Sequence, residues 1–122
     1  MPEFGRKSFL KLRTCHQDLQ EILCEAIVHM DFTVLEGFRS MERQNMLSET
    51  GKSKLQWPNS KHNTHPSRAV DIAPWPIDWN DLDRFRELAE LIKKIAKEKG
   101  IEIEWGGDWK NFIDMPHFQL KD

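Results

Sequence analysis

The sequence lacks long hydrophobic runs and has no excess of one charge. Its 122 residues contain no stretch of about 18 apolar side chains, the length that would cross a bilayer as a helix. The 18 basic and 20 acidic residues are interspersed, so no basic face predicts a nucleic-acid partner. The first residues also lack the apolar core and small-residue cleavage site of a secretory signal. We therefore expect the protein to accumulate in the cytoplasm of the cell that makes it.

Cysteine is also scarce, with Cys15 and Cys24 alone in the chain. The apolar spacing predicts one helix that contains both, with Thr14 and Gln17 as its capping box. Along a helix the two would lie about 13.5 Å apart, whereas a disulfide needs Cα atoms within about 7 Å. The sequence therefore predicts two free thiols.

The patterning predicts a single α+β domain over residues 1–122, with a small antiparallel sheet flanked by helices. Residues 51–68 lack a stable period and predict a long loop, which in a compact domain is usually functional. Asn80 is the expected N-cap of the last helix and Gly100 its end. The expected helices cover residues 14–30, 40–49 and 80–99, and the expected strands cover 32–38, 69–73, 101–105 and 117–120.

Three residues in separate segments have the chemistry of a metal site. His62 lies near the end of the polar loop, Asp71 lies in mid-strand and His117 begins the last strand. Two imidazoles and a carboxylate can bind a zinc ion and leave its fourth position for water. Asp114 adds a second carboxylate that could accept a proton from that water. These are the components of a metallohydrolase.

Ordinary roles for the same residues remain open at this point. His117 could be a hydrogen-bonded core imidazole, and Asp114 could bond to backbone amides in a turn. His65 competes with His62, because it lies six residues before Asp71 where His62 lies nine before it. Spacing does not choose between the two histidines.

Five motifs in order resemble a known family, the zinc D-Ala-D-Ala carboxypeptidases and L-alanyl-D-glutamate endopeptidases, and among them the small phage endolysins. The resemblance extends from about residue 4 to residue 120 and implies a fold of the Hedgehog and DD-peptidase type. The motifs are Gly37-Phe38-Arg39-Ser40 with Gln44, Ser60-Lys61-His62, Ala69-Val70-Asp71, Trp105-Gly106-Gly107-Asp108-Trp109 and Asp114-Met115-Pro116-His117-Phe118.

The resemblance also implies roles for single residues. One zinc ion would be bound by His62, Asp71 and His117, with Asp114 as the catalytic acid–base. Arg39 would steady the substrate carbonyl or the oxyanion formed from it. The link from His62 to Asp71 is longer than the family's usual glycine-containing link, which keeps His65 as an alternative ligand.

Five tryptophans in so short a chain could wall a groove for a peptide or a glycan strand. Large aromatic side chains are more often core, and Trp75, Trp79 and Trp105 are left without a role. We assign substrate binding to Trp109, and to Ser60 of the Ser-Lys-His motif.

The leading function is a zinc peptidase that cuts the stem peptide of bacterial peptidoglycan, at the L-alanyl–D-glutamate bond. As an endolysin it would reach the wall through a membrane hole made by another protein, and it is expected to be a monomer. A D-alanyl-D-alanine carboxypeptidase or dipeptidase is the first alternative, although an export signal would suit it better. The second is a catalytically inactive, metal-stabilised binding module, against which Asp114 and Arg39 argue.

Overall fold

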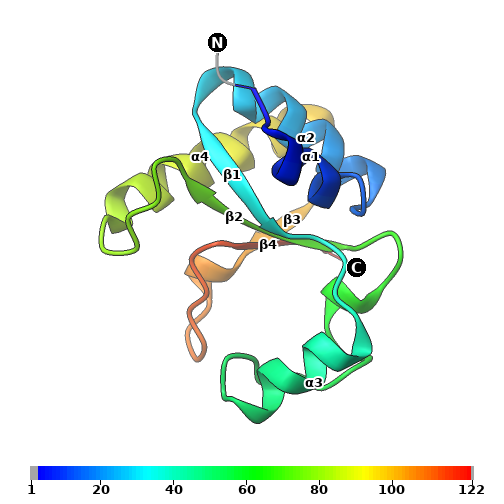
Figure 1. Ribbon diagram of the computed structural model, residues 1–122. Helices are drawn as coiled ribbons and strands as arrows, with labels where there is room; N and C mark the ends of the chain where they lie inside the picture. The colour runs from blue at the N-terminus through cyan, green and yellow to red at the C-terminus, as the bar shows by residue number, and fades with distance from the viewer. Residues whose placement is uncertain (1–2, 122) are drawn as a thin grey trace.

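The computed structural model describes residues 3–121 (Figure 1). Met1 and Pro2 lie outside the described residues, as does Asp122. The first two belong to the N-terminal segment in which we expect no secretory signal. Within the described residues, no helix is long and apolar enough to cross a membrane. The elements are α1 (Arg6–Leu12), α2 (Gln17–His29), β1 (Phe32–Glu36), α3 (Met41–Glu49), the 3₁₀ turn η1 (Lys61–Asn63), β2 (Ala69–Pro74), α4 (Leu82–Lys99), β3 (Ile103–Trp105), the 3₁₀ turn η2 (Gly106–Asp108) and β4 (His117–Leu120).

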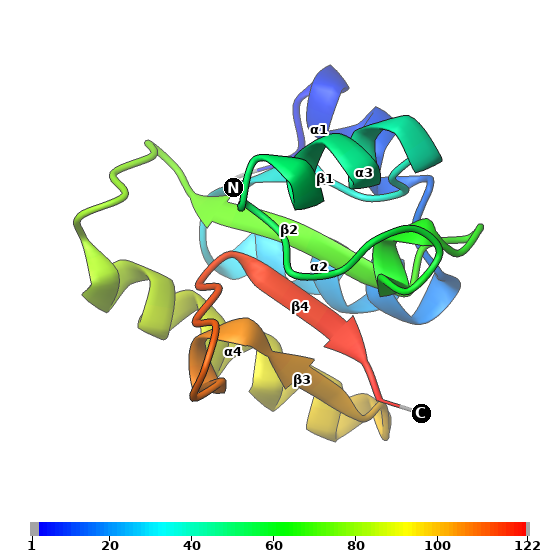
Figure 2. The same ribbon diagram turned by 90° about the horizontal axis from the view of Figure 1, so that it is seen from below.

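The four strands form one antiparallel sheet in the order β1-β2-β4-β3 (Figure 2). The last strand in sequence thus lies between β2 and β3, at the centre of the sheet. Asp71 of β2 lies directly opposite His117 of β4. The predicted α+β class and its small antiparallel sheet are confirmed.

Helices α2 and α4 cover one face of this sheet (Figure 1). Val70, Ile72 and Phe118 point toward the helices and are nearly inaccessible to solvent. Because side chains alternate along a strand, Asp71 and His117 project from the opposite face. The apolar core therefore supports, from behind, a polar surface at the middle of the sheet.

The opposite face carries α3 and two long connections, residues 50–68 between α3 and β2 and residues 106–116 between β3 and β4. Ser40 caps α3, because its hydroxyl accepts a hydrogen bond from the Arg43 amide. Figure 1 shows α3 on one side of this face and the segment between β3 and β4 on the other. The two segments form the walls of the cleft described below.

The N-terminal helices differ from the prediction. Residues 6–12 form a separate helix, α1, and α2 begins at Gln17, where His16 accepts the amide of Asp18. The Thr14 hydroxyl instead accepts the amide of Phe38, so the predicted capping box is wrong. The pattern did not reveal α1 because Ser8 and Leu12 are its buried residues, too few for a visible apolar stripe.

Cys15 precedes α2, where it pairs with Ser67 in an isolated β-bridge, so the two cysteines do not share a helix. Both are free thiols, as predicted. Burial raises the pKa of the Cys15 thiol to about 12. At the other end of the chain, α4 ends at Gly100 as expected, but its N-cap is Asp81 rather than Asn80.

Candidate metal centre

The floor of the candidate site is a pair of facing residues on the two central strands. Asp71 and His117 are directly opposite each other, so their side chains meet on the same face. The Oδ1 atom of Asp71 lies 3.0 Å from Nδ1 of His117. Neither residue could be moved by one position without turning its side chain into the helical core.

The third residue comes from the long loop. Ser60 and Asn63 form a capping box around η1, and the Ser60 hydroxyl also accepts the amide of His62. This turn places the His62 ring over the sheet, where it is 1% exposed. Its Nε2 atom lies 3.2 Å from Asp71 Oδ1 and 3.2 Å from His117 Nδ1.

The outward nitrogens of both imidazoles have acceptors. His62 Nδ1 is 2.8 Å from the carbonyl oxygen of Gly37, and His117 Nε2 is 2.8 Å from Oε1 of Gln119. A carbonyl oxygen cannot donate, so each outward nitrogen carries a hydrogen. The inward nitrogens then face each other and the Asp71 carboxylate, an arrangement that a cation at its centre would stabilise.

The size of the group also fits a metal ion. Ligands about 2.0–2.2 Å from a tetrahedral zinc ion are separated from one another by about 3.3 Å. The three atom pairs here are 3.0 to 3.2 Å apart. His62, Asp71 and His117 therefore form a group that could bind a metal ion. His65 lies outside this group, exposed at the surface with its ring 5.2 Å from that of Phe38.

Electrostatics at the group favour positive charge. Burial by itself would raise the pKa of Asp71, but the charges and hydrogen bonds of His62 and His117 outweigh it and lower this pKa. Burial likewise disfavours a charged His117, yet the hydrogen bond to Asp71 raises its pKa. The ionised carboxylate that would hold a proton on the ring can equally hold a metal cation.

Asp114 lies beside the group without belonging to it. Its amide donates to the Gly106 carbonyl, and its own carbonyl accepts the amide of His117, which fixes a tight turn before β4. The Oδ2 atom of Asp114 lies 3.9 Å from His117 Nδ1. Burial, reinforced by the charge of Asp71, raises the pKa of Asp114. A carboxyl with a raised pKa next to a metal site is suited to accept and return a proton.

Arg39 is buried against the carboxylates. It donates to Glu36 Oε1 at 2.9 Å and to Gln44 Oε1 at 2.8 Å, and it reaches Oδ2 of Asp71 at 3.5 Å. Arg39 thus contacts the oxygen of Asp71 that faces away from His62. Among residues 3–121, its buried Nε has no hydrogen-bond partner, which leaves one N–H for a ligand.

These residues lie in a cleft of about 670 Å³. Arg39, Asp114 and the three possible ligands line it, as do Ser60 and Trp109, so the structure brings together every residue that the sequence predicted for the site. The Trp109 ring lies 5.1 Å from the ring of His117. Trp79 lines the cleft as well, whereas Trp105 is buried behind it.

Some contacts of the site were not predicted. Gln119 follows His117 by two positions and so shares its face of β4, a signal that strand alternation could have provided. Glu36 precedes Arg39 by three residues, but nothing in the sequence indicates that the two side chains meet. The carbonyl of Gly37 is a main-chain partner, which residue type does not report.

Fold and site together are those of a hydrolase with a candidate metal centre, in which a carboxylate and an arginine stand beside three converging ligands. Comparison with known proteins identifies the family. A sequence model of phage L-alanyl-D-glutamate peptidases matches residues 2–120. The chain belongs to this family of peptidases.

Individual relatives agree with this assignment. The L-alanyl-D-glutamate peptidase of Escherichia phage T5 is 34% identical over 125 residues, which cover 98% of this chain and 89% of that protein. The peptidoglycan L-alanyl-D-glutamate endopeptidase CwlK of Bacillus subtilis is 30% identical over 106 residues, covering 75% of this chain and 61% of CwlK. The crystal structure of the L-Ala D-Glu endopeptidase ChiX from Serratia marcescens superposes with a TM-score of 0.85 at 36% identity, covering 97% of this chain and 89% of ChiX.

Proposed function

We propose that this protein is a zinc-dependent peptidoglycan hydrolase that cuts the stem peptide between L-alanine and D-glutamate. The observation that carries the proposal is the convergence of two imidazole nitrogens and a carboxylate oxygen, 3.0 to 3.2 Å apart, on the floor of a cleft. Two nitrogens and one carboxylate with an open fourth position are the ligands of catalytic zinc sites. The names of the relatives support the choice of bond.

Each nearby side chain has a task in this reaction. Zinc, when bound, supplies the Lewis acidity that makes water a nucleophile near neutral pH. Asp114 takes the proton of the attacking water and returns it to the leaving amine, a role that its raised pKa favours. Arg39 holds Asp71 in position and offers its Nε–H to the oxygen on which negative charge develops.

Ser60 and Trp109 both line the cleft and would contribute to substrate binding in different ways. The Ser60 hydroxyl caps η1 and is 6% exposed, so its contribution to binding passes through the position of His62. Trp109 presents an aromatic surface next to His117 and can pack against the peptide.

The proposal extends to where the protein acts. It would be made in the cytoplasm of a bacterial host and would act on the cell wall after the membrane has been permeabilised, as an endolysin does. It would act as a monomer, because the three possible ligands, Asp114 and Arg39 all come from one chain.

Mass spectrometry of muropeptides tests the function. Purified sacculi are incubated with the protein, with and without a chelator that removes zinc. We expect new termini at L-alanine and D-glutamate, and none when the chelator is present. Release of terminal D-alanine alone would indicate a carboxypeptidase, and intact sacculi with bound protein would indicate a binding module; either result would overturn the proposal.

A further inference from the structure

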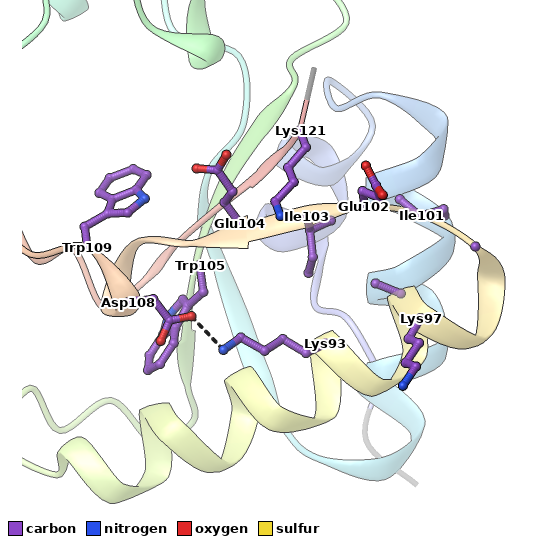
Figure 3. A pocket seen from close by; sticks show the side chains of 12 residues that line it. Lys93, Lys97, Ile101, Glu102, Ile103, Glu104, Trp105, Asp108, Trp109 and Lys121 are labelled. Atoms are coloured by element: carbon purple, nitrogen blue, oxygen red, sulfur yellow. Dashed lines mark hydrogen bonds and ion pairs between the residues drawn. The ribbon is translucent and has the colours of Figure 1, made fainter.

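A second cavity runs along β3, outside the catalytic cleft. It has a volume of about 690 Å³ and lies between the C-terminal half of α4 and β3, the end strand of the sheet (Figure 3). In Figure 3, Ile103 and Trp105 point from β3 toward α4, whereas Glu104 projects from the other side of the strand. We name this cavity the β3 groove. It combines an apolar floor with charged rims.

The β3 groove and the catalytic cleft share one lining residue. Trp109 lines both cavities, so the two approach each other at this side chain. At its other end, Ile101, Glu102 and Lys121 also line a third cavity of about 610 Å³ that extends to Arg68. Linked by these shared residues, the three cavities form a track of neighbouring cavities, an extent suited to a polymer rather than to a small molecule.

The charges along this track are balanced. A polyanion such as a nucleic acid would require a stripe of one sign, which is absent from the lining of the two outer cavities. Side chains of both signs above an apolar floor instead match a neutral polymer with hydroxyl and amide groups. The four basic residues are Arg68, Lys93, Lys97 and Lys121, and the four acidic residues are Asp18, Glu102, Glu104 and Asp108.

The proposed substrate places such a polymer next to the cleft. In peptidoglycan, the amino group of the first stem residue is joined by an amide bond to a sugar of the glycan strand. An extended residue spans about 3.3–3.6 Å, so this sugar lies within about two residue lengths of the bond that is cut. The ring of Trp109, which is 5.1 Å from that of His117 and lines both cavities, lies within this reach of the metal centre.

We propose that the β3 groove binds the glycan strand of peptidoglycan while the catalytic cleft holds the stem peptide. The inference rests on the proposed function and adds the polymer to which the cut peptide is attached. Lys97 and Glu102, both exposed on the rims, pair with sugar hydroxyl and acetamido groups, and Ile103 packs against the C–H faces of the rings. Affinity for the strand keeps the protein beside successive stem peptides.

The test compares two substrates that differ in the glycan alone: intact sacculi and a soluble stem peptide without sugar. The double variant Lys97→Ala/Glu102→Ala removes two rim side chains that do not line the catalytic cleft. We expect it to cut sacculi about tenfold more slowly, the effect of losing two hydrogen bonds, and to cut the free peptide as fast as the unchanged protein. Lys94→Ala/Glu98→Ala, on exposed positions of α4 that do not line the groove, is the matched control.

Each outcome is decisive. Equal rates on sacculi for both double variants, or an equal loss on both substrates, would overturn the proposal, the latter indicating a structural role or a groove for peptide. A wild-type protein that cuts neither substrate would instead contradict the proposed function. As a second measurement, the zinc-loaded wild-type protein is titrated with glycan strands stripped of peptide, where saturable binding weakened by Lys97→Ala/Glu102→Ala is expected and no binding would also overturn the proposal.

Discussion

At the scale of single residues, the hydrogen bonds around His62, Asp71 and His117 determine how these three side chains are oriented. The Gly37 carbonyl and the Gln119 side chain fix the outward nitrogens of His62 and His117, so the orientation of each ring is set before any ion binds. Arg39 does the same for the carboxylate of Asp71. Three side chains are therefore positioned by partners that would not themselves touch the metal.

The different roles proposed for His62, a metal ligand, and Asp114, a proton acceptor, give a first prediction. Asp114→Asn should retain about one zinc ion per chain but lose about 10²- to 10⁴-fold in turnover, because the amide cannot accept the proton. His62→Ala should lose both zinc and activity. Elemental analysis and rates on sacculi measure the two effects.

Matched controls exist for both changes. Asp83→Asn alters an exposed carboxylate at the start of α4, and His29→Ala alters an exposed histidine at the end of α2. Both should leave zinc content and rate unchanged. An Asp114→Asn protein that stays folded but contains no zinc would contradict the assignment of Asp114.

Gln119 gives a second prediction. Gln119→Ala removes the acceptor of the His117 Nε2 hydrogen, so the ring can rotate and we expect zinc affinity to fall about 10- to 100-fold. Competition with a chromophoric chelator measures this affinity. Gln56→Ala, in the exposed part of the loop, should have no effect, and an unchanged affinity in Gln119→Ala would show that the contact does not orient the ring.

At the scale of elements, strand alternation explains how much of the site was predictable. The pattern of residues 69–73 placed Asp71 opposite Val70 and Ile72, and the structure confirms that separation of faces. The ends of helices were less predictable. The Thr14 hydroxyl accepts a hydrogen bond from the amide of Phe38, 24 residues away, instead of capping α2. Contacts of this kind depend on how elements pack, and local patterns do not encode them.

The turn after β1 gives a third prediction. A Cβ on Gly37 would collide with the Thr14 hydroxyl and lie 2.6 Å from the main-chain oxygen of Lys11, which cannot move cheaply. Gly37→Ala should therefore cost about 1–3 kcal/mol in the free energy of unfolding and weaken zinc binding by shifting the carbonyl that orients His62.

Urea unfolding and a zinc titration measure the two effects. Gly5→Ala is the control, because no heavy atom lies within 4 Å of the added carbon there. Equal stability of the two variants would mean that the turn after β1 adjusts without cost.

At the scale of the whole molecule, the candidate metal centre joins parts that are remote in sequence. His62 and His117 are 55 residues apart, and the loop that carries His62 has little secondary structure besides η1. An ion bound to both would connect this loop to the central strands. Metal binding should therefore be coupled to the stability of the fold.

Removal of zinc gives the fourth prediction. Zinc at about 100 times its dissociation constant should stabilise the folded protein by about 2.7 kcal/mol, which corresponds to a rise in Tm of about 10 °C. Differential scanning calorimetry with zinc and with a chelator measures the shift. The His62→Ala protein should melt at the same temperature in both conditions. An equal Tm of the wild-type protein with zinc and with chelator would contradict a metal centre at this position.

One face of the sheet packs against helices and the other carries the cleft, which has a consequence for how such proteins can diversify. Helices α2 and α4 secure the strands from one side, while α3 and the segment before β4 shape the cleft on the other. Exchange of those two wall segments would alter which peptide fits and leave the hydrophobic interior untouched. The same scaffold can thus come to cut the peptides of a different cell wall through changes in these two segments alone.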